Sequence, residues 1–318
     1  MNRDTLILGL NPTWQRLFIL EKLHLGSVNR LPPADEYASG KGINCARVLK
    51  SLGNDPLLVH FLGTGHGKQI FDEVATAGVK QVSVWIREAT RISTTIIQGG
   101  ETTELIEPSP VLSSEENEDF IQSLKDSWKN AGRVVLCGSF PAKFQAEKMF
   151  ELDTAGKRLF IDAVSVDSWL EREVELLKVN MDEYRTLLQR YNIPQVTSSP
   201  QFWKMTATAL LERLHIRTLI VTDRAAPVRA FRVLEGKLQT FQLSPPPVSL
   251  VNDIGAGDAF MAGWLYGDSL GLSLEDCLVK ATAVAAARCE AELPWELKMK
   301  SVELFEQELA GAIAKAGD

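Results

Sequence analysis

The feature that most limits the possible folds is a regular alternation of helix-type and strand-type segments after residue 114. Segments with apolar residues at helical spacing alternate with short, continuous apolar runs, which is typical of a parallel sheet covered by helices on both faces. We expect helices at 114–130, 144–155, 182–191, 201–214, 273–291 and 295–315, and strands at 133–139, 158–163, 175–180 and 217–223. The sequence therefore predicts an α/β fold with a mostly parallel central sheet.

The first part of the chain follows the same alternation but contains two excursions. We expect strands at 5–10 and 56–63 and a helix at 42–53. The segments near 13–38 and 88–108 do not fit, and β-branched residues on both sides of Gly99-Gly100 indicate a hairpin. We interpret these two segments as a small β lid beside the main sheet. Because no linker or repeat divides the chain, we expect residues 1–318 to form a single domain.

Composition excludes several classes of function. The chain has 318 residues, 45% of them hydrophobic and 24% charged, with a net charge of −7 and no basic run. This balance argues against nucleic-acid binding. No apolar run approaches the length of a membrane span, and the N-terminal apolar stretch is too short for a signal peptide, so we expect a cytoplasmic protein. The four cysteines are scattered without metal-ligand spacing.

Small or polar residues follow nearly every expected strand. Asn11, Ser139, Asp162, Asn180 and Asp223 all stand at such positions. Ligands of parallel α/β sheets bind outside the carboxyl ends of the strands. The sequence therefore predicts a binding site at this edge of the sheet.

A glycine-rich motif, "NDIGAGDAFMAG", occupies residues 252–263 and leads into an apolar helical pattern. Gly255, Ala256 and Gly257 permit a sharp turn and close approach to the backbone, at a point where free amides and a helix dipole favour an anion. Asp258 then follows. From these residues alone, a plain turn with Asp258 as a helix N-cap remains open.

A second motif, "SGKGIN" at residues 39–44, also places glycines directly before a helix. Lys41 stands between Gly40 and Gly42. Backbone amides with one lysine suit a phosphate or a cluster of sugar hydroxyls, whereas a lysine on a solvated loop is the alternative.

Together the two motifs resemble those of the ribokinase-like carbohydrate kinases of phosphofructokinase-B type. The pattern G-K-G-I-N-x-A-R-x-L-x-x-L-G is followed about two hundred residues later by D-x-G-A-G-D-x-F-x-A-G. The short segments "LNP", "GSFP", "NMDE" and "PPPV" extend the resemblance along most of the chain. It is similar in particular to the branch that contains 1-phosphofructokinase and tagatose-6-phosphate kinase.

The resemblance implies a role for each matching residue. Asp258 would be the general base, and the amides of Gly255, Ala256 and Gly257 would form an anion hole. The sugar phosphate would be bound by Asn11, Gln15, Gly40, Lys41, Asn44, Arg91 and Ser139, with Lys41 and Arg91 on its phosphate. The nucleotide side would consist of Asn180, Glu183, Thr222, Arg224 and Asp253. ATP and Mg²⁺ are the implied cofactors, with Glu183 holding the metal through water, and the lid would serve a homodimer.

Two departures from the family pattern leave alternatives open. Gln15 stands where an aspartate usually grips sugar hydroxyls, so the identity of the sugar is undetermined. Arg224 and Pro227 replace glycines usual in the nucleotide loop, and proline removes an amide. The alternatives are therefore a sugar-phosphate-binding protein with little or no activity, and a kinase for an unphosphorylated sugar or a nucleoside.

Overall fold

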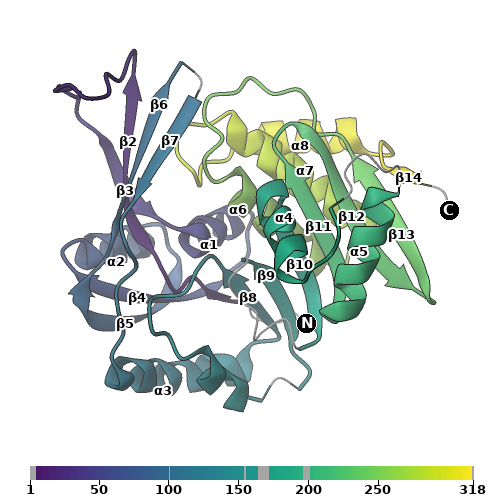
Figure 1. The fold of residues 1–318 in the computed structure, drawn as a ribbon, viewed down its shortest axis with the longest axis horizontal. Coiled ribbons are helices and arrows are strands. Elements are labelled where there is room, and N and C mark those ends of the chain that lie inside the picture. The colour runs from purple at the N-terminus through teal and green to yellow at the C-terminus, as the bar shows by residue number, and fades with distance from the viewer. Residues whose placement is uncertain (1–4, 100, 154, 164–171, 196–200, 317–318) are drawn as a thin grey trace.

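The computed structural model describes residues 5–99, 101–153, 155–163, 172–195 and 201–316. Its main sheet has ten strands in the order β14-β13-β12-β11-β10-β9-β8-β1-β4-β5 (Figure 1). The strands from β5 to β11 pair in parallel, and β12, β13 and β14 add antiparallel strands at one edge. The prediction of a mostly parallel sheet is confirmed. The ten strands are β1 Thr5–Leu8, β4 Leu57–Thr64, β5 Lys80–Ala89, β8 Arg133–Cys137, β9 Arg158–Asp162, β10 Val174–Asn180, β11 Ile216–Asp223, β12 Ala226–Leu234, β13 Lys237–Leu243 and β14 Ala314–Ala316.

Helices cover both faces of this sheet. Successive residues of a strand are therefore buried on opposite sides of the sheet. In β1, Ile7 packs into one apolar cluster and Leu6 and Leu8 into the other. The Ile7 face is covered by α1 Lys41–Ser51, α2 Gly67–Thr76, α6 Ala256–Ser269, α7 Leu274–Cys289 and α8 Met299–Leu309. The opposite face is covered by α3 Ser114–Asn130, α4 Met181–Arg190 and α5 Phe202–Arg213. No helix among these described residues is long and apolar enough to cross a membrane.

The two excursions form a separate four-stranded sheet in the order β3-β2-β6-β7, which projects from the main body at the upper left of Figure 1. Its strands are β2 Thr13–Leu20, β3 Asp35–Ser39, β6 Ile92–Gln98 and β7 Glu101–Ile106. The predicted hairpin is β6–β7, and it joins β2 through parallel pairing of β2 with β6. The lid expected from the sequence is therefore present as one small sheet.

Two expected helices differ from the observed elements. The expected helix at 144–155 is a 3₁₀ helix over Ala146–Glu151, and residue 154 lies outside the described part. Lys143, just before it, has a positive φ of 58° that an α-helix cannot include. The expected helix at 295–315 is shorter, since α8 ends at Leu309 and the chain then enters β14. The helix at 114–130 is confirmed with its bounds unchanged as α3.

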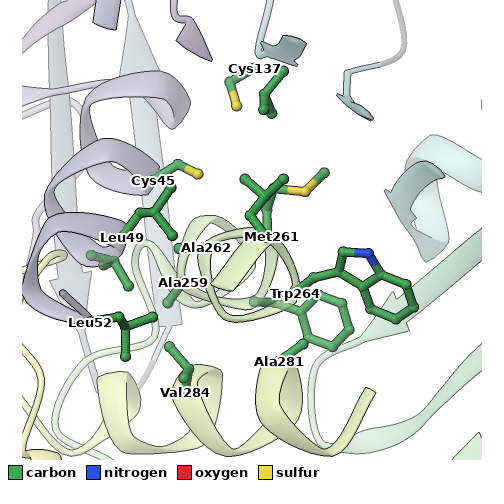
Figure 2. Packing of buried hydrophobic residues seen from close by; sticks show 14 of the residues in the cluster. Cys45, Leu49, Leu52, Cys137, Ala259, Met261, Ala262, Trp264, Ala281 and Val284 are labelled. Atoms are coloured by element: carbon green, nitrogen blue, oxygen red, sulfur yellow. The ribbon is translucent and has the colours of Figure 1, made fainter. Parts of the chain in front are cut away.

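Small residues let the helices that carry the two glycine motifs pack closely. Figure 2 shows Ala259 of α6 near Leu49 of α1, with Val284 of α7 below. A Cβ atom on Gly263 of α6 would lie 2.9 Å from the Cα of Ala281 in α7. Gly263 thereby lets α6 lie directly against α7, and a hydrogen bond of 2.8 Å from Asn44 to Asp258 joins the first turns of α1 and α6.

A very close backbone contact joins the end of β1 to the start of α1. A Cβ atom on Gly42 would lie 2.3 Å from the Cα of Gly9, which no side-chain movement can relieve. We expect Gly42→Ala to lower the free energy of unfolding by about 3 kcal/mol or more, because the two backbones would have to separate. Gly67→Ala is the matched control: its Cβ would be tight at 3.3 Å from the Cβ of Leu62, which a small shift can relieve, so we expect a smaller loss. Denaturant titration of both variants tests this, and equal stabilities would contradict it.

Candidate active site

A cavity of about 320 Å³ opens where the carboxyl ends of β1 and β8 meet the N-terminus of α1 and the lid. Its wall is formed by Gly9, Asn11, Pro12, Gly40, Lys41, Gly42, Ile43, Arg91, Ile106, Cys137, Gly138, Ser139, Ala163 and Glu183. Five of the seven residues predicted to bind the sugar phosphate lie on this wall: Asn11, Gly40, Lys41, Arg91 and Ser139. Polar strand ends therefore meet here, as the sequence predicts.

Asn11 and Arg91 are held in place by one another and by nearby hydroxyls. The amide nitrogen of Asn11 donates to Ser109 at 2.7 Å and to Ser139 at 2.8 Å. Arg91 donates one terminal nitrogen to the carbonyl of Asn11 at 3.0 Å. Its Nε atom and the side-chain oxygen of Asn11 are buried without a partner among the residues that the structure describes. Both residues line the cavity.

The charged centre of the site is Asp162, at the end of β9. Its side chain is 1% exposed and accepts from Lys41 Nζ at 2.8 Å and from Lys178 Nζ at 2.9 Å. Burial alone would raise the pKa of Asp162, but the two ammonium groups hold it below its usual value. Lys41 also donates to Glu183 at 2.9 Å. Burial alone would lower the pKa of Lys41, but both carboxylates raise it, so the lysine is fully charged.

Lys178 connects this centre to the beginning of α6. A Cβ atom on Gly257 would lie 2.8 Å from Lys178 Nζ, so the ammonium group stands directly beside this glycine. Gly255 is the N-cap of α6, with a left-handed φ of 83°, and Gly257 is in the first turn. The Ala256 amide donates to the carbonyl of Asp253 at 3.2 Å. Of the three predicted anion-hole amides, that of Ala256 is thus already engaged within the loop.

Asp258 is the third residue of α6 and not its N-cap, so the capping alternative is wrong. Its carboxylate is buried and accepts from the side-chain amide of Asn44 in α1 at 2.8 Å. Burial raises the pKa of Asp258 to about 6, helped by the charge of Asp162 and opposed by Lys41, Asn44 and Lys178. A carboxylate with a pKa near neutrality is suited to accept a proton from a hydroxyl group.

The residues predicted on the nucleotide side are more scattered. Asn180 caps α4 and exchanges hydrogen bonds of 2.8 Å with Glu183 in a capping box. Thr222, the residue before the last of β11, donates a long hydrogen bond of 3.4 Å from its hydroxyl group to the carbonyl of Val179. Arg224 lies in the tight turn between β11 and β12 with a φ of 47°. Asp253 is exposed in the loop before α6. Within the described ranges, no cluster of three or more metal-ligating side chains is present.

Gln15 lies away from the cavity wall. It is buried in the lid, where its amide nitrogen donates to Thr95 at 2.8 Å. The structure also adds Lys178 and Ser109, which sequence reasoning did not assign to the site. A lysine within the apolar strand 174–180 was the available signal for Lys178, since a buried ammonium group requires a partner.

Comparison with known proteins agrees with this geometry. A model of the pfkB family of carbohydrate kinases matches residues 16–294. Tagatose-6-phosphate kinase from Staphylococcus epidermidis is 28% identical over 286 residues, which cover 87% of this chain and 89% of that protein. 1-Phosphofructokinase from Vibrio cholerae is 25% identical over 296 residues, covering 90% and 89%.

The fold is also similar to that of phosphofructokinase-2 from Escherichia coli, solved in complex with substrates and products. The TM-score is 0.84, with 19% sequence identity over 96% of this chain and 99% of that chain. The family that the two glycine motifs indicated is therefore confirmed. Because the family model spans most of its length, the chain belongs to the pfkB family of carbohydrate kinases.

Proposed function

We propose that the protein transfers the terminal phosphoryl group of ATP to a hydroxyl group of a phosphorylated sugar. The observation that carries this proposal is a continuous set of charges from the cavity to the start of α6. Lys41 and Arg91 face the cavity, Asp162 joins Lys41 to Lys178, and Lys178 stands beside Gly257. The cavity end, with Lys41 and Arg91, suits the phosphate already present on the sugar. The α6 end, with Lys178 and Gly257, suits the phosphoryl group that is transferred.

At the cavity end, the sugar phosphate is bound by two cations and several hydrogen-bonding groups. Arg91 lines the cavity, and we assign its guanidinium group to charge-assisted bonds with phosphate oxygens. Lys41 supplies the second charge. We assign the side chains of Asn11 and Ser139, which also line the cavity, to sugar hydroxyls. Gln15, whose amide donates to Thr95 within the lid, is not part of the cavity wall.

At the α6 end, the acceptor hydroxyl gives its proton to Asp258 as its oxygen attacks the γ-phosphorus. The bond between that phosphorus and the β–γ bridging oxygen breaks, and ADP leaves. The amides of Gly255 and Gly257, with the helix dipole, stabilise the charge on the transferring group. Lys178 adds a full positive charge at the same place. Asn44 holds Asp258 in the orientation required.

Mg²⁺ fits this site on one condition. Magnesium is usually bound through one or two carboxylates, waters and substrate phosphates, and Glu183 is a carboxylate of that kind at the cavity wall. Its Oε1 atom is held by Lys41, so the ion requires Lys41 to turn away. A sugar phosphate that draws Lys41 to itself releases Glu183. The bound ion would neutralise phosphate charge.

The test of the proposed function is ADP release measured over a panel of sugars. We expect turnover with a hexose phosphate and ATP, and much lower kcat/KM with the matching free sugars. The same panel is repeated with other nucleoside triphosphates, because Arg224 and Pro227 alter the nucleotide loop. Preference for a free sugar or a nucleoside would contradict the proposal. Binding of a sugar phosphate without any turnover would favour the alternative of a binding protein.

Arg91→Ala tests the phosphate contact. We expect KM for the sugar phosphate to rise by roughly 10-fold to 100-fold, because a charge-assisted hydrogen bond contributes about 1.5–3 kcal/mol. KM for the unphosphorylated parent sugar should change little. Arg87→Ala is the control, since Arg87 is an exposed arginine that pairs with Glu115 outside the cavity. An equal rise of KM for both sugars would contradict the assigned role.

Asp258→Asn tests the general base. The variant keeps the size of the side chain and can still accept from Asn44, but it cannot take a proton. We expect kcat to fall by about 10²–10⁴-fold while the sugar phosphate still binds. In the wild type, kcat/KM should fall as pH drops below about 6, because Asp258 becomes protonated. A variant that turns over near the wild-type rate would exclude Asp258 as the base.

The same substitution has a consequence for stability. The pKa of Asp258 in the folded state, about 6, is above the ordinary aspartate value of 3.8, so the charged carboxylate destabilises the folded protein above pH 6. Asp258→Asn should therefore raise the free energy of unfolding at pH 7.5 by roughly 1–3 kcal/mol. This gain should vanish as pH falls from 6 to 4. Denaturant unfolding at several pH values checks it, and a loss of stability at pH 7.5 would contradict it.

The lid is proposed to pair with the lid of a second copy. Its edge strand β7 is exposed along its whole length, and Leu105 and Ile19 are 57% and 67% exposed. Exposed apolar residues on an edge sheet favour association. We expect light scattering to give about twice the monomer mass of 35.2 kDa. Ile19→Asp with Leu105→Asp should yield monomers, whereas Leu304→Asp on α8 should not. A monomeric wild type would contradict this proposal.

A further inference from the structure

Arg288, near the end of α7, is the most deeply buried charged residue outside the cavity among the residues that the structure describes. Its residue is 0% exposed, and one terminal nitrogen donates to the carbonyl of Ala291 at 2.8 Å. Its Nε and second terminal nitrogen have no hydrogen-bond partner among the residues that the structure describes. Burying a guanidinium group with so few partners is costly, and the fold retains it behind the beginning of α6.

The charge of Arg288 has no directly bonded counter-ion among the described residues. Burial lowers the pKa of Arg288, and the neighbouring Cys289, Tyr37, Glu296 and Asp253 oppose this shift. An arginine remains charged at any physiological pH. Burial also raises the pKa of the adjacent Tyr37 to about 12, so that phenol is neutral. No described carboxylate is hydrogen-bonded to the guanidinium group, so its field acts on its surroundings.

The segment that Arg288 holds is packed against the loop that begins α6. The amide of Val251 donates to the carbonyl of Cys289 at 2.8 Å. The side chain of Asn252 donates to the carbonyl of Glu292 at 2.8 Å and accepts from the amide of Ile254 at 2.9 Å. Residues 288–292 and 251–254 thus form one bonded unit behind the glycine motif.

This unit touches the glycine that sets the geometry of the anion hole. A Cβ atom on Gly255 would lie 2.8 Å from the carbonyl oxygen of Pro294, so the segment after Arg288 lies directly against Gly255. Gly255 has a left-handed φ of 83°, which directs the first amides of α6. A shift of the 288–294 segment would therefore be transmitted to Gly255 and to those amides.

We infer that Arg288 is a positioning residue for phosphoryl transfer, which fixes the 288–294 segment against Gly255 and supplies a permanent positive charge behind the anion hole. This inference rests on the proposed function. Charge on the transferring phosphoryl group is greatest in the transition state, so Arg288 should affect kcat more than substrate binding. A residue that served folding alone would affect stability without this separation.

Arg288→Lys and Arg288→Met test the inference, with Arg133→Met as the matched control. Lysine keeps the charge, whereas methionine removes it at similar length. Arg133 is also buried, but it pairs with Asp268 and Thr5 at the opposite end of the sheet. We expect Arg288→Met to lower kcat by about 10-fold to 100-fold with KM unchanged. Arg288→Lys should lie between it and the wild type, and Arg133→Met should lower Tm while kcat is kept.

A binding measurement that needs no turnover separates this inference from the proposed function. Calorimetry compares ADP with Mg²⁺ against ADP with Mg²⁺ and tetrafluoroaluminate, which mimics a transferring phosphoryl group. We expect Arg288→Met to lose about 10-fold or more in affinity only for the tetrafluoroaluminate complex. Wild-type affinity and kcat in both folded variants would overturn the inference. Equal kcat values for Arg288→Lys and Arg288→Met would contradict the proposal that the positive charge of Arg288 contributes to phosphoryl transfer. Arg288→Lys provides both measurements if Arg288→Met does not fold.

Discussion

The site depends on one buried carboxylate, Asp162, that lies between two ammonium groups. Lys41 comes from the start of α1 and Lys178 from the end of β10, so a single side chain joins the two glycine motifs. Removing one partner from such a buried group typically costs about 3–5 kcal/mol, because a charge is left uncompensated. The positions of both lysines, and of the helix N-termini beside them, therefore follow from this contact.

The arrangement also explains how an acidic chain can bind phosphates. The net charge of −7 gives no general attraction for anions. Positive charge is instead concentrated by burial: Lys41, Lys178 and Arg91 meet at one end of the sheet, where the helix dipoles of α1 and α6 have the same sign. Within a protected site such charges act more strongly than they would at the surface.

Local sequence signals predicted the parts of the fold and site that depend on local physics. The capping box of α3 begins that helix where the sequence indicates, and the glycine motifs open α1 and α6 because close backbone contact requires glycine. Long-range pairings were not predictable in this way. Lys178 is hydrogen-bonded to Asp162 of a neighbouring strand, and Gln15 is hydrogen-bonded to Thr95 of a neighbouring strand in the lid. Both contacts depend on which strands pair in the folded protein. A 3₁₀ helix at Ala146–Glu151 stands in place of an expected α-helix, directly after the left-handed backbone of Lys143, which the apolar spacing of this segment does not indicate.

The central claim is that one site holds a sugar phosphate at Lys41 and Arg91 while its acceptor hydroxyl meets Asp258. The most direct measurement is a crystal structure with a hexose phosphate and a non-hydrolysable ATP analogue. The account predicts the sugar phosphate on Arg91 and Lys41, the acceptor hydroxyl within hydrogen-bond distance of Asp258, and the γ-phosphate at the amides of Gly255 and Gly257. A sugar phosphate bound with no hydroxyl near Asp258, or a γ-phosphate away from α6, would contradict it.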